Sequence, residues 1–201
     1  MNAASFWEVI SRYNKQTWPV QVIFFVGIIL SLIISKNSKY KNLVKITLGL
    51  SNLFISFVFF FHYGTEPIQK FFAFPLYLII GLLFLYESIK NYDDTLQKAA
   101  VPQLLLILLF LLYPFLSHLL GNRFPGTVTY IMPCPLITLS IALYSMYKTR
   151  NRALLLCLAL WGLTGIKSLF FNAYEDLILL AAGLYCIYIL IKNRSRKLES
   201  L

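Results

Sequence analysis

The side chains best suited to binding or chemistry are few, and they adjoin long apolar segments. They are Asn14, His62, Cys134, Lys167, Glu175 and Asp176. Ionisable groups within membrane-spanning segments are costly to keep there, so they are candidates for function by default. A structural interpretation stands beside this one. Most of these residues fall within a turn or two of a segment end, where they can serve as interface anchors and helix caps.

Cys134 is flanked by Pro133 and Pro135 inside the apolar stretch from Thr127 to Tyr147. Each proline lacks a backbone N–H and crowds the carbonyl four residues earlier, so a helix through this stretch should break. In hydrocarbon, an unpaired carbonyl costs several kcal/mol unless protein or water satisfies it. The Pro-Cys-Pro segment is therefore predicted to face other helices or a wet cavity, with the remaining helices arranged around it.

The predicted substrate-binding residues are Asn14, His62, Cys134 and Asp176. The residues with a predicted structural role are Pro133, Pro135, Lys167 and Glu175. Lys167 and Asp176 have opposite charges on consecutive segments, which favours an ion pair between them. Cys134 and His62 suit soft or borderline metal ions, but a C-x-x-C pair and clustered histidines are absent. A metal site is therefore the weaker alternative, and no cofactor is predicted.

The composition identifies the class of protein. The chain has 201 residues, of which 59% are hydrophobic and 13% charged, against about 25% charged in soluble domains. Apolar runs recur with only short polar breaks, which is typical of a polytopic membrane protein. The formal charge of +10 lies mainly in short loops, a pattern of membrane topology rather than of nucleic-acid binding. We predict an all-α transmembrane bundle in a lipid bilayer, with one membrane domain over residues 1–201.

Seven spans are predicted within residues 18–191, each of about 18 to 21 residues, close to the ~20 needed to cross a bilayer. They are residues 18–35, 43–62, 71–89, 100–120, 127–147, 153–171 and 174–191. Only Asn172 and Ala173 separate the last two, which leaves a tight hairpin and one longer broken segment as alternatives. Residues 192–201 form a basic tail.

Residues 1–17 precede the first span and place Phe6, Val9, Ile10 and Tyr13 on one helical face. We predict a short amphipathic helix at the membrane interface. Most of the 18 Lys and Arg residues fall on one side of the seven spans. The positive-inside rule then puts the N-terminus outside and the C-terminus in the cytoplasm.

Two further expectations concern close helix packing at small residues and a surface ion pair of one acidic residue. Gly162 and Gly165, and the run from Ala181 to Gly183, are predicted to let the last two spans approach closely. Glu87 ends the third span beside Lys90, so a surface ion pair is expected there.

Several segments occur together in an order that resembles a known family. They are Phe6…Tyr13-Asn14…Trp18-Pro19, then Pro133-Cys134-Pro135, then Trp161-Gly162…Gly165, then Asp176 before a Leu-Ala-Gly run. Over nearly its whole length the chain resembles an uncharacterised bacterial family of small integral-membrane proteins, classed as a domain of unknown function. The resemblance implies a seven-helix protein of the bacterial cytoplasmic (inner) membrane, and it implies no activity.

The function predicted from these features is that of a small-solute transporter of permease type, with a polar cavity open to the outside at the broken fifth span. A homodimer would compensate for the small size. The alternative is a membrane sensor or accessory subunit that binds a ligand or a partner membrane protein. An enzyme is less favoured, because G-x-S-x-G and H-E-x-x-H signatures are absent. An intramembrane enzyme would have to bring His62, Cys134 and Asp176 together.

Overall fold

The structure is a computed structural model that describes residues 3–37 and 40–198, with side chains from residue 4 through residue 192 outside that gap. Residues 1–2 of the predicted amphipathic helix, Lys39, and residues 199–201 of the predicted tail lie outside the described residues. The helices, in chain order, are α1 (Ala3–Ile34), α2 (Leu43–Phe54), η2 (Ile55–His62), η3 (Gln69–Ala73), α3 (Phe74–Lys90), α4 (Val101–Leu119), α5 (Pro133–Tyr144), α6 (Arg152–Leu163), η4 (Thr164–Lys167), α7 (Ser168–Phe171), η5 (Tyr174–Asp176) and α8 (Leu177–Leu198).

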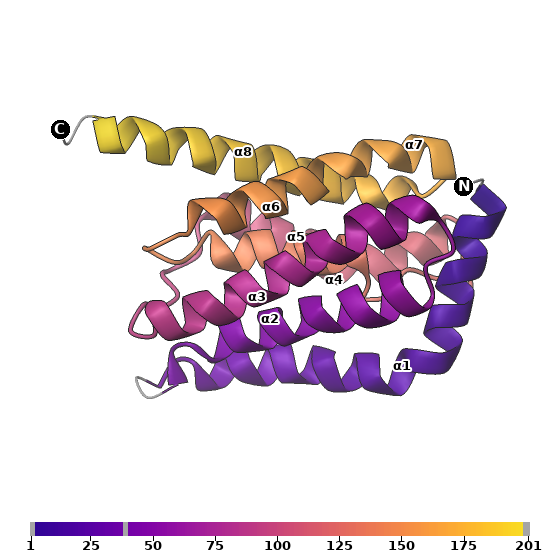
Figure 1. Cartoon of the computed structure of the whole chain (residues 1–201), viewed down its shortest axis with the longest axis horizontal. Helices are drawn as coiled ribbons and strands as arrows, with labels where there is room; N and C mark the ends of the chain where they lie inside the picture. The colour runs from indigo at the N-terminus through magenta and orange to yellow at the C-terminus, as the bar shows by residue number, and fades with distance from the viewer. Residues whose placement is uncertain (1–2, 38–39, 199–201) are drawn as a thin grey trace.

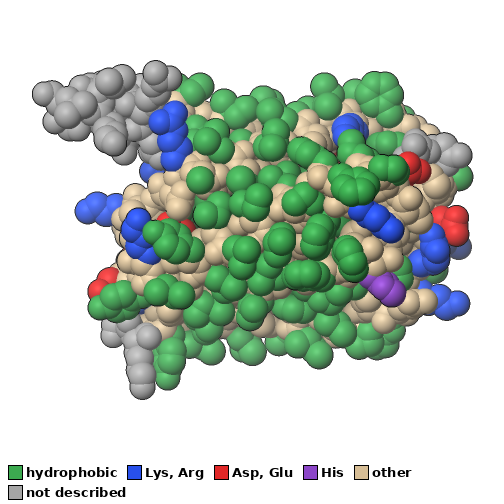
Figure 2. All heavy atoms as spheres, viewed as in Figure 1, with side chains coloured by type: hydrophobic (Ala, Val, Ile, Leu, Met, Phe, Trp, Pro, Cys, Tyr) green, Lys and Arg blue, Asp and Glu red, His purple; other side chains and the backbone are tan. Residues whose placement is uncertain are grey.

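The described residues are all-α, as predicted, and they contain no strand beyond a single bridge between Leu96 and Tyr147. The helices run along one bundle whose two chain ends lie at opposite ends of the long axis (Figure 1). Hydrophobic side chains cover the middle of the face seen in Figure 2, and most charged side chains lie toward its two ends. This distribution suits a molecule with lipid around its middle.

Within residues 3–37 and 40–198, six helical segments are long and apolar enough to cross a membrane. They are Ala4–Ile34, Leu43–His62, Gln69–Lys90, Val101–Leu119, Arg152–Phe171 and Tyr174–Lys192. Six of the seven predicted spans therefore have counterparts of sufficient length. The prediction of a membrane-length helix over residues 127–147 is wrong, because α5 has only 12 residues and extends about 18 Å at ~1.5 Å per residue.

The prolines begin α5 instead of breaking a longer helix. Pro133 occupies the start of the helix, where a missing N–H costs nothing because that group has no intrahelical partner. The preceding carbonyl of Ile131 accepts a hydrogen bond of 2.6 Å from the Tyr13 hydroxyl. The carbonyl of Pro133 accepts one of 2.7 Å from the Tyr77 hydroxyl. Buried phenols thus satisfy backbone groups near the start of α5.

The chain still passes from one end of the bundle to the other around α5. Residues Pro125 and Thr127 contact Asn14 near one end, and Thr149 contacts Asp94 at the other. From Leu136 to Tyr144, every residue of α5 is buried. Pro133 and Pro135 are buried as well, so they face protein and not lipid, as the sequence predicted.

The predicted interface helix and first span form one helix, α1, which bends so that its first part crosses one end of the bundle (Figure 1). The predicted apolar face exists, and it packs on protein: Val9, Ile10 and Tyr13 are buried. Location of this part at a membrane surface, like the direction of the whole chain across a membrane, stays a prediction.

The last two membrane-length segments form a tight hairpin, which settles the alternative left open by the sequence. Asn172 takes the left-handed conformation at the turn, with φ 55°. The predicted close approach is also present, because a Cβ added to Gly165 would lie 2.6 Å from the Leu180 backbone nitrogen.

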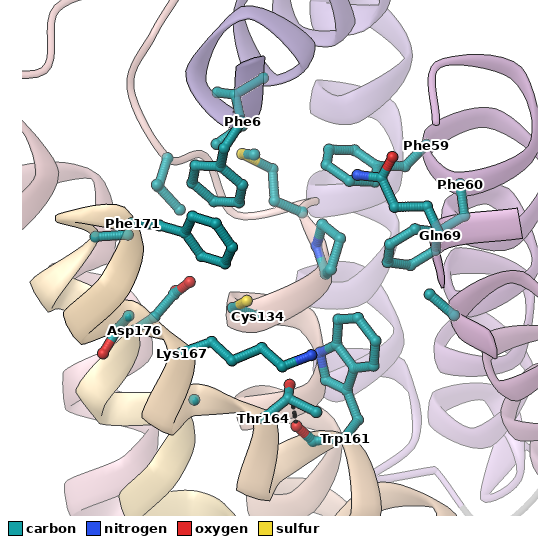
Figure 3. Close-up of a pocket in the computed structure, with 18 of the residues that line it drawn as sticks. Phe6, Phe59, Phe60, Gln69, Cys134, Trp161, Thr164, Lys167, Phe171 and Asp176 are labelled. Atoms are coloured by element: carbon teal, nitrogen blue, oxygen red, sulfur yellow. Dashed lines mark hydrogen bonds between the residues drawn. The ribbon is translucent and has the colours of Figure 1, made fainter. Parts of the chain in front are cut away.

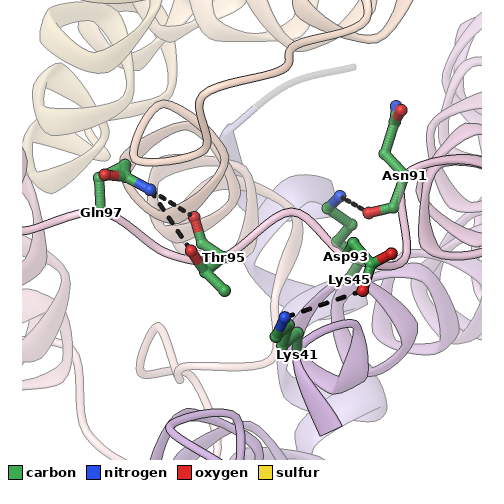
Figure 4. A network of polar contacts seen from close by, with 6 residues as sticks. All are labelled: Lys41, Lys45, Asn91, Asp93, Thr95 and Gln97. Carbon is green, nitrogen blue, oxygen red and sulfur yellow. Dashed lines mark hydrogen bonds and ion pairs between the residues drawn. The ribbon is translucent and has the colours of Figure 1, made fainter. Parts of the chain in front are cut away.

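At the opposite end of the bundle, a buried lysine holds a loop (Figure 4). Lys45 is fully buried; its ammonium donates a hydrogen bond of 2.9 Å to the Asn91 carbonyl and lies 4.4 Å from the centre of the Tyr147 ring. Glu87 is buried too, and it accepts hydrogen bonds from the amides of Asn91 and Asn151. The predicted surface ion pair of Glu87 with Lys90 is therefore wrong.

Candidate functional site

Three helical segments change their winding around one region at the end of the bundle that carries Asn14. The segments η2 and η3 are π-helical, and η4 is a 3₁₀-helix. Such departures from α-helical winding inside longer helices often mark functional sites or hinges. They move side chains out of the register that a continuous α-helix would give, so they reshape the surface that the three segments enclose.

These segments enclose a pocket of about 300 Å³. The aromatic residues in its wall are Phe6, Phe59, Phe60, Phe72, Trp161 and Phe171. Figure 3 shows most of these rings arranged around Cys134, which also belongs to the pocket wall. The polar residues of the wall are Gln69, Thr164, Lys167, Ser168 and Asp176. Most of the wall is apolar, which corrects the prediction of a polar cavity at this position.

The first part of α1 covers the pocket on one side. Phe6 and Ile10 belong to the wall. The Phe6 ring stacks on the Phe171 ring with centroids 5.2 Å apart, and the indole N–H of Trp7 donates a hydrogen bond of 3.2 Å to the Phe171 carbonyl. The start of the chain is thereby fixed to the turn that joins the last two membrane-length segments.

Cys134 and Asp176, two of the predicted binding residues, meet in this pocket. Asp176 is 8% exposed and its carboxyl lies beside the Cys134 thiol and the Tyr113 phenol. Its Oδ1 atom has no hydrogen-bond partner among the described residues, and the same holds for the Ser168 hydroxyl. Two polar residues of the mostly apolar wall thus each carry a buried atom without a hydrogen-bond partner among the described residues.

Lys167 shares the pocket without pairing with Asp176. Between described residues, the ion pairs within 4.0 Å are Glu8–Arg12 and Lys41–Asp93. Figure 3 shows the Lys167 side chain extending toward Trp161 and away from Asp176. The predicted Lys167–Asp176 ion pair is wrong, because the 3₁₀ turn η4 directs the lysine side chain across the pocket. Glu175 is buried next to Asp176, outside the pocket wall.

Asn14 lies outside the pocket wall and holds the chain that leads into α5. Its side-chain N–H groups donate hydrogen bonds of 2.8 Å and 2.7 Å to the carbonyls of Pro125 and Thr127. Its oxygen accepts from the amide of Gln21 and the hydroxyl of Thr129. With both donors and its acceptor in use, Asn14 has a structural role in this conformation.

His62 also lies outside the pocket wall, exposed at the end of η2. Within the described ranges, no three His, Cys, Asp or Glu side chains gather where they could hold a metal ion. The weaker alternative of a metal site on Cys134 and His62 gains no support. The hypothesis of an intramembrane enzyme also loses one of the three residues it needs.

Sequence reasoning missed the aromatic wall. The runs of phenylalanine at residues 57–61 and 71–74 were visible, but an apolar run on a membrane helix indicates lipid contact as readily as a pocket. The π-helical winding that turns Phe59, Phe60 and Phe72 toward the pocket has no known signal in the residue order. Trp161 entered only as one of the residues that carry the family resemblance.

The described part of the chain defines a class: an all-helical fold with six membrane-length apolar helices, a short buried helix and a pocket at one end. The chain belongs to DUF6064, a family of unknown function, which it matches over residues 3–200. This agrees with the resemblance seen in the sequence to an uncharacterised membrane family. Comparison with curated proteins and with solved structures gives no match.

Proposed function

We propose that this protein is a multispanning membrane protein that binds a small amphipathic molecule in the pocket around Cys134. The observation that carries the proposal is the aromatic-walled pocket of about 300 Å³ with few polar atoms. Small-molecule sites are typically concave, mostly apolar and furnished with a few convergent polar groups, at volumes of about 300–1,000 Å³. The pocket meets this description at the lower limit of size.

The residues at the pocket mouth support an amphipathic ligand. Ile68 is 53% exposed and Phe72 37% exposed, and the exposed Lys167 lies with them in the wall. They lie at one end of the membrane-length helices, where bilayer hydrocarbon gives way to headgroups and water. A molecule with an apolar body and a polar group would concentrate at this level and enter from there.

The packing of α5 favours binding without passage, as in a sensor or accessory subunit. Cys134 and Pro135 form part of the pocket wall, and the helix continues from them toward the other end as the buried run from Leu136 to Tyr144. A bound molecule would have to displace this helix to cross. The sequence favoured a transporter over a sensor or subunit, whereas we now favour the sensor or subunit.

Transport of the same molecule is the second candidate, and one observation favours it. Val128 and Met132 of the pocket wall belong to the non-helical chain before α5. Discontinuous helices of this kind form substrate sites in many transporters. A homodimer or a partner membrane protein, and a location in the bacterial inner membrane, remain parts of the proposal.

The test is ligand binding by the purified protein in nanodiscs, followed by thermal unfolding and by tryptophan fluorescence. The probes are phenethyl alcohol, phenethylamine and phenylacetate, which share an aromatic body. At least one should bind saturably and raise the unfolding temperature. The variant Ala73→Phe, which fills the pocket, should lose this binding, while Ala153→Phe on the exposed surface should keep it. Equal binding by Ala73→Phe, or no binding of any probe, would overturn the proposal.

Flux measurements in proteoliposomes separate the two candidates. Binding of a probe without its movement across the bilayer supports the sensor or subunit. Saturable movement that Ala73→Phe abolishes supports the transporter.

A further inference from the structure

Two neighbouring carboxyl groups, one of them in the pocket wall, are buried at the start of the last membrane-length segment. Glu175 is 3% exposed and Asp176 is 8% exposed. Both side-chain oxygens of Glu175 and the Oδ1 atom of Asp176 are buried without a hydrogen-bond partner among the described residues. Of the two, Asp176 belongs to the pocket wall. Asp176 is thus the carboxyl-bearing residue that borders the pocket.

The groups packed around these carboxyls are neutral. Asp176 lies beside Cys134 and Tyr113, and Glu175 lies beside Ser117 and Asn122. The basic residue of the pocket wall is Lys167, whose side chain extends toward Trp161 (Figure 3). Among the described side chains, therefore, none with a positive charge forms an ion pair with Asp176.

A buried carboxylate is strongly unfavourable unless a positive group or hydrogen bonds compensate it. A positive group would meet a second favourable feature in this pocket. The faces of aromatic rings attract cations, and most strongly so where water is excluded. Phe60 and Trp161 lie in the wall with ring centroids 5.3 Å apart, and Phe6 and Phe171 stack on another side. Both the carboxyl and the rings select for positive charge.

We infer that the pocket takes an amphipathic cation, a protonated amine on an apolar body. The ammonium group meets the Asp176 carboxylate, and the apolar body lies against the rings of Phe60, Trp161 and Phe171. The inference rests on the proposed function, because it names the class of molecule that the same pocket binds. The Lys167 side chain extends across the pocket toward Trp161, but the residue is exposed and solvent screens its charge, so it opposes a cation less than the buried carboxyl attracts it.

The test compares three probes that differ in charge and share one aromatic body, by titration of the wild-type protein in nanodiscs. Phenethylamine should bind about tenfold more tightly than phenethyl alcohol, as expected for a hydrogen bond to a charged group. Phenylacetate should bind most weakly. In Asp176→Asn, the preference for the amine over the alcohol should disappear. The matched control Glu8→Gln removes an exposed carboxylate outside the pocket and should keep the preference.

The outcomes separate this inference from the proposed function. Equal affinity of the wild type for all three probes, or a preference for phenylacetate, would overturn the inference that the ligand is a cation. Neither result would contradict the proposal that the pocket binds a small molecule. Failure of all three to bind would overturn the binding function itself. The wild-type comparison decides even where Asp176→Asn does not fold. A further variant, Lys167→Met, removes the positive charge at the mouth and should tighten phenethylamine binding a few-fold; weaker binding would also count against the inference.

Discussion

Gly162 and Gly183 face each other where α6 crosses α8, and the backbones approach so closely that a Cβ on Gly162 would lie 2.5 Å from the Gly183 Cα. The obstructing atom is backbone, which cannot turn aside as a side chain can. Without a hydrophobic driving force between helices in lipid, close backbone contact at small residues is a main source of helix association. The hairpin that carries Lys167 and Asp176 is held together here.

Gly162→Ala should therefore destabilise the protein by about 1–3 kcal/mol, since the added methyl group forces the helices apart. Thermal unfolding in detergent would measure the loss. The matched control is Gly27→Ala in α1, where an added Cβ meets nothing within 4 Å. This control should be neutral or slightly stabilising. Equal stability of the two variants would contradict the close crossing.

Asn14→Ala should lower the free energy of unfolding by about 1–3 kcal/mol, because it leaves the carbonyls of Pro125 and Thr127 without their donor. Loosening of the chain before α5 should also speed proteolysis between residues 120 and 132. Lys15→Ala changes the exposed neighbouring residue and should leave both measurements unchanged. Wild-type protease resistance in Asn14→Ala would show that this residue does not hold the segment.

Lys45→Met should cost more stability than Lys41→Met at the same end of the bundle. Lys45 is buried, and its loss leaves the Asn91 carbonyl without a donor, at about 1–3 kcal/mol. Lys41 makes only a partly exposed ion pair of 3.7 Å with Asp93, which is worth about 0–1 kcal/mol. Chemical unfolding of the two variants in parallel gives the comparison. A larger loss in Lys41→Met would refute the assignment.

Trp7→Phe should make Cys134 more accessible. The change keeps an aromatic ring and removes the hydrogen bond to the Phe171 carbonyl that fixes α1 over the pocket. In a background of Cys157→Ser and Cys186→Ser, the rate of Cys134 alkylation by N-ethylmaleimide should rise several-fold. Trp18→Phe alters a residue that is 55% exposed and outside the pocket wall, and should not change the rate.

The direction of the chain across a membrane can be tested with reporters. The basic residues predict that a fluorescent protein fused after the last residue folds in the cytoplasm and fluoresces. Alkaline phosphatase inserted at Asn122 should be active, because that loop lies at the end of the bundle that carries Asn14. The reverse pattern would show that the charge distribution was misread.

Much of the fold could be predicted because apolar length is a direct physical signal. The predicted span 43–62 coincides with the segment Leu43–His62, and the span 174–191 is nearly the segment Tyr174–Lys192. The fifth span failed for a local reason. Its apolar residues were counted as helix, but the stretch before Pro133 is held in non-helical form by Tyr13 and Asn14, more than a hundred positions away. Long-range partners of this kind are not encoded in the apolar pattern.

The candidate site was predictable only in part. The chemical type of their side chains singled out Cys134 and Asp176 as candidate binding residues, and the structure brings the two together. The same reasoning singled out Asn14 and His62, which lie outside the pocket wall. A polar side chain near a helix end is as often a hydrogen-bonding anchor as a binding group, and the sequence does not distinguish the two. The positions of the aromatic rings that η2 and η3 contribute to the pocket wall depend on the π-helical winding of these two segments. That winding is a property of the assembled backbone.

The burial of α5 constrains how the protein is made. This short helix packs against α2 and α4, which are synthesised before it, and against α6 and α8, which are synthesised after it. Its buried hydroxyl group at Ser140 accepts a hydrogen bond of 3.4 Å from the side-chain amide of Asn52 in α2. During insertion into the membrane, α5 can therefore reach its final buried position only after the C-terminal hairpin of α6 and α8 has been synthesised and has packed against it.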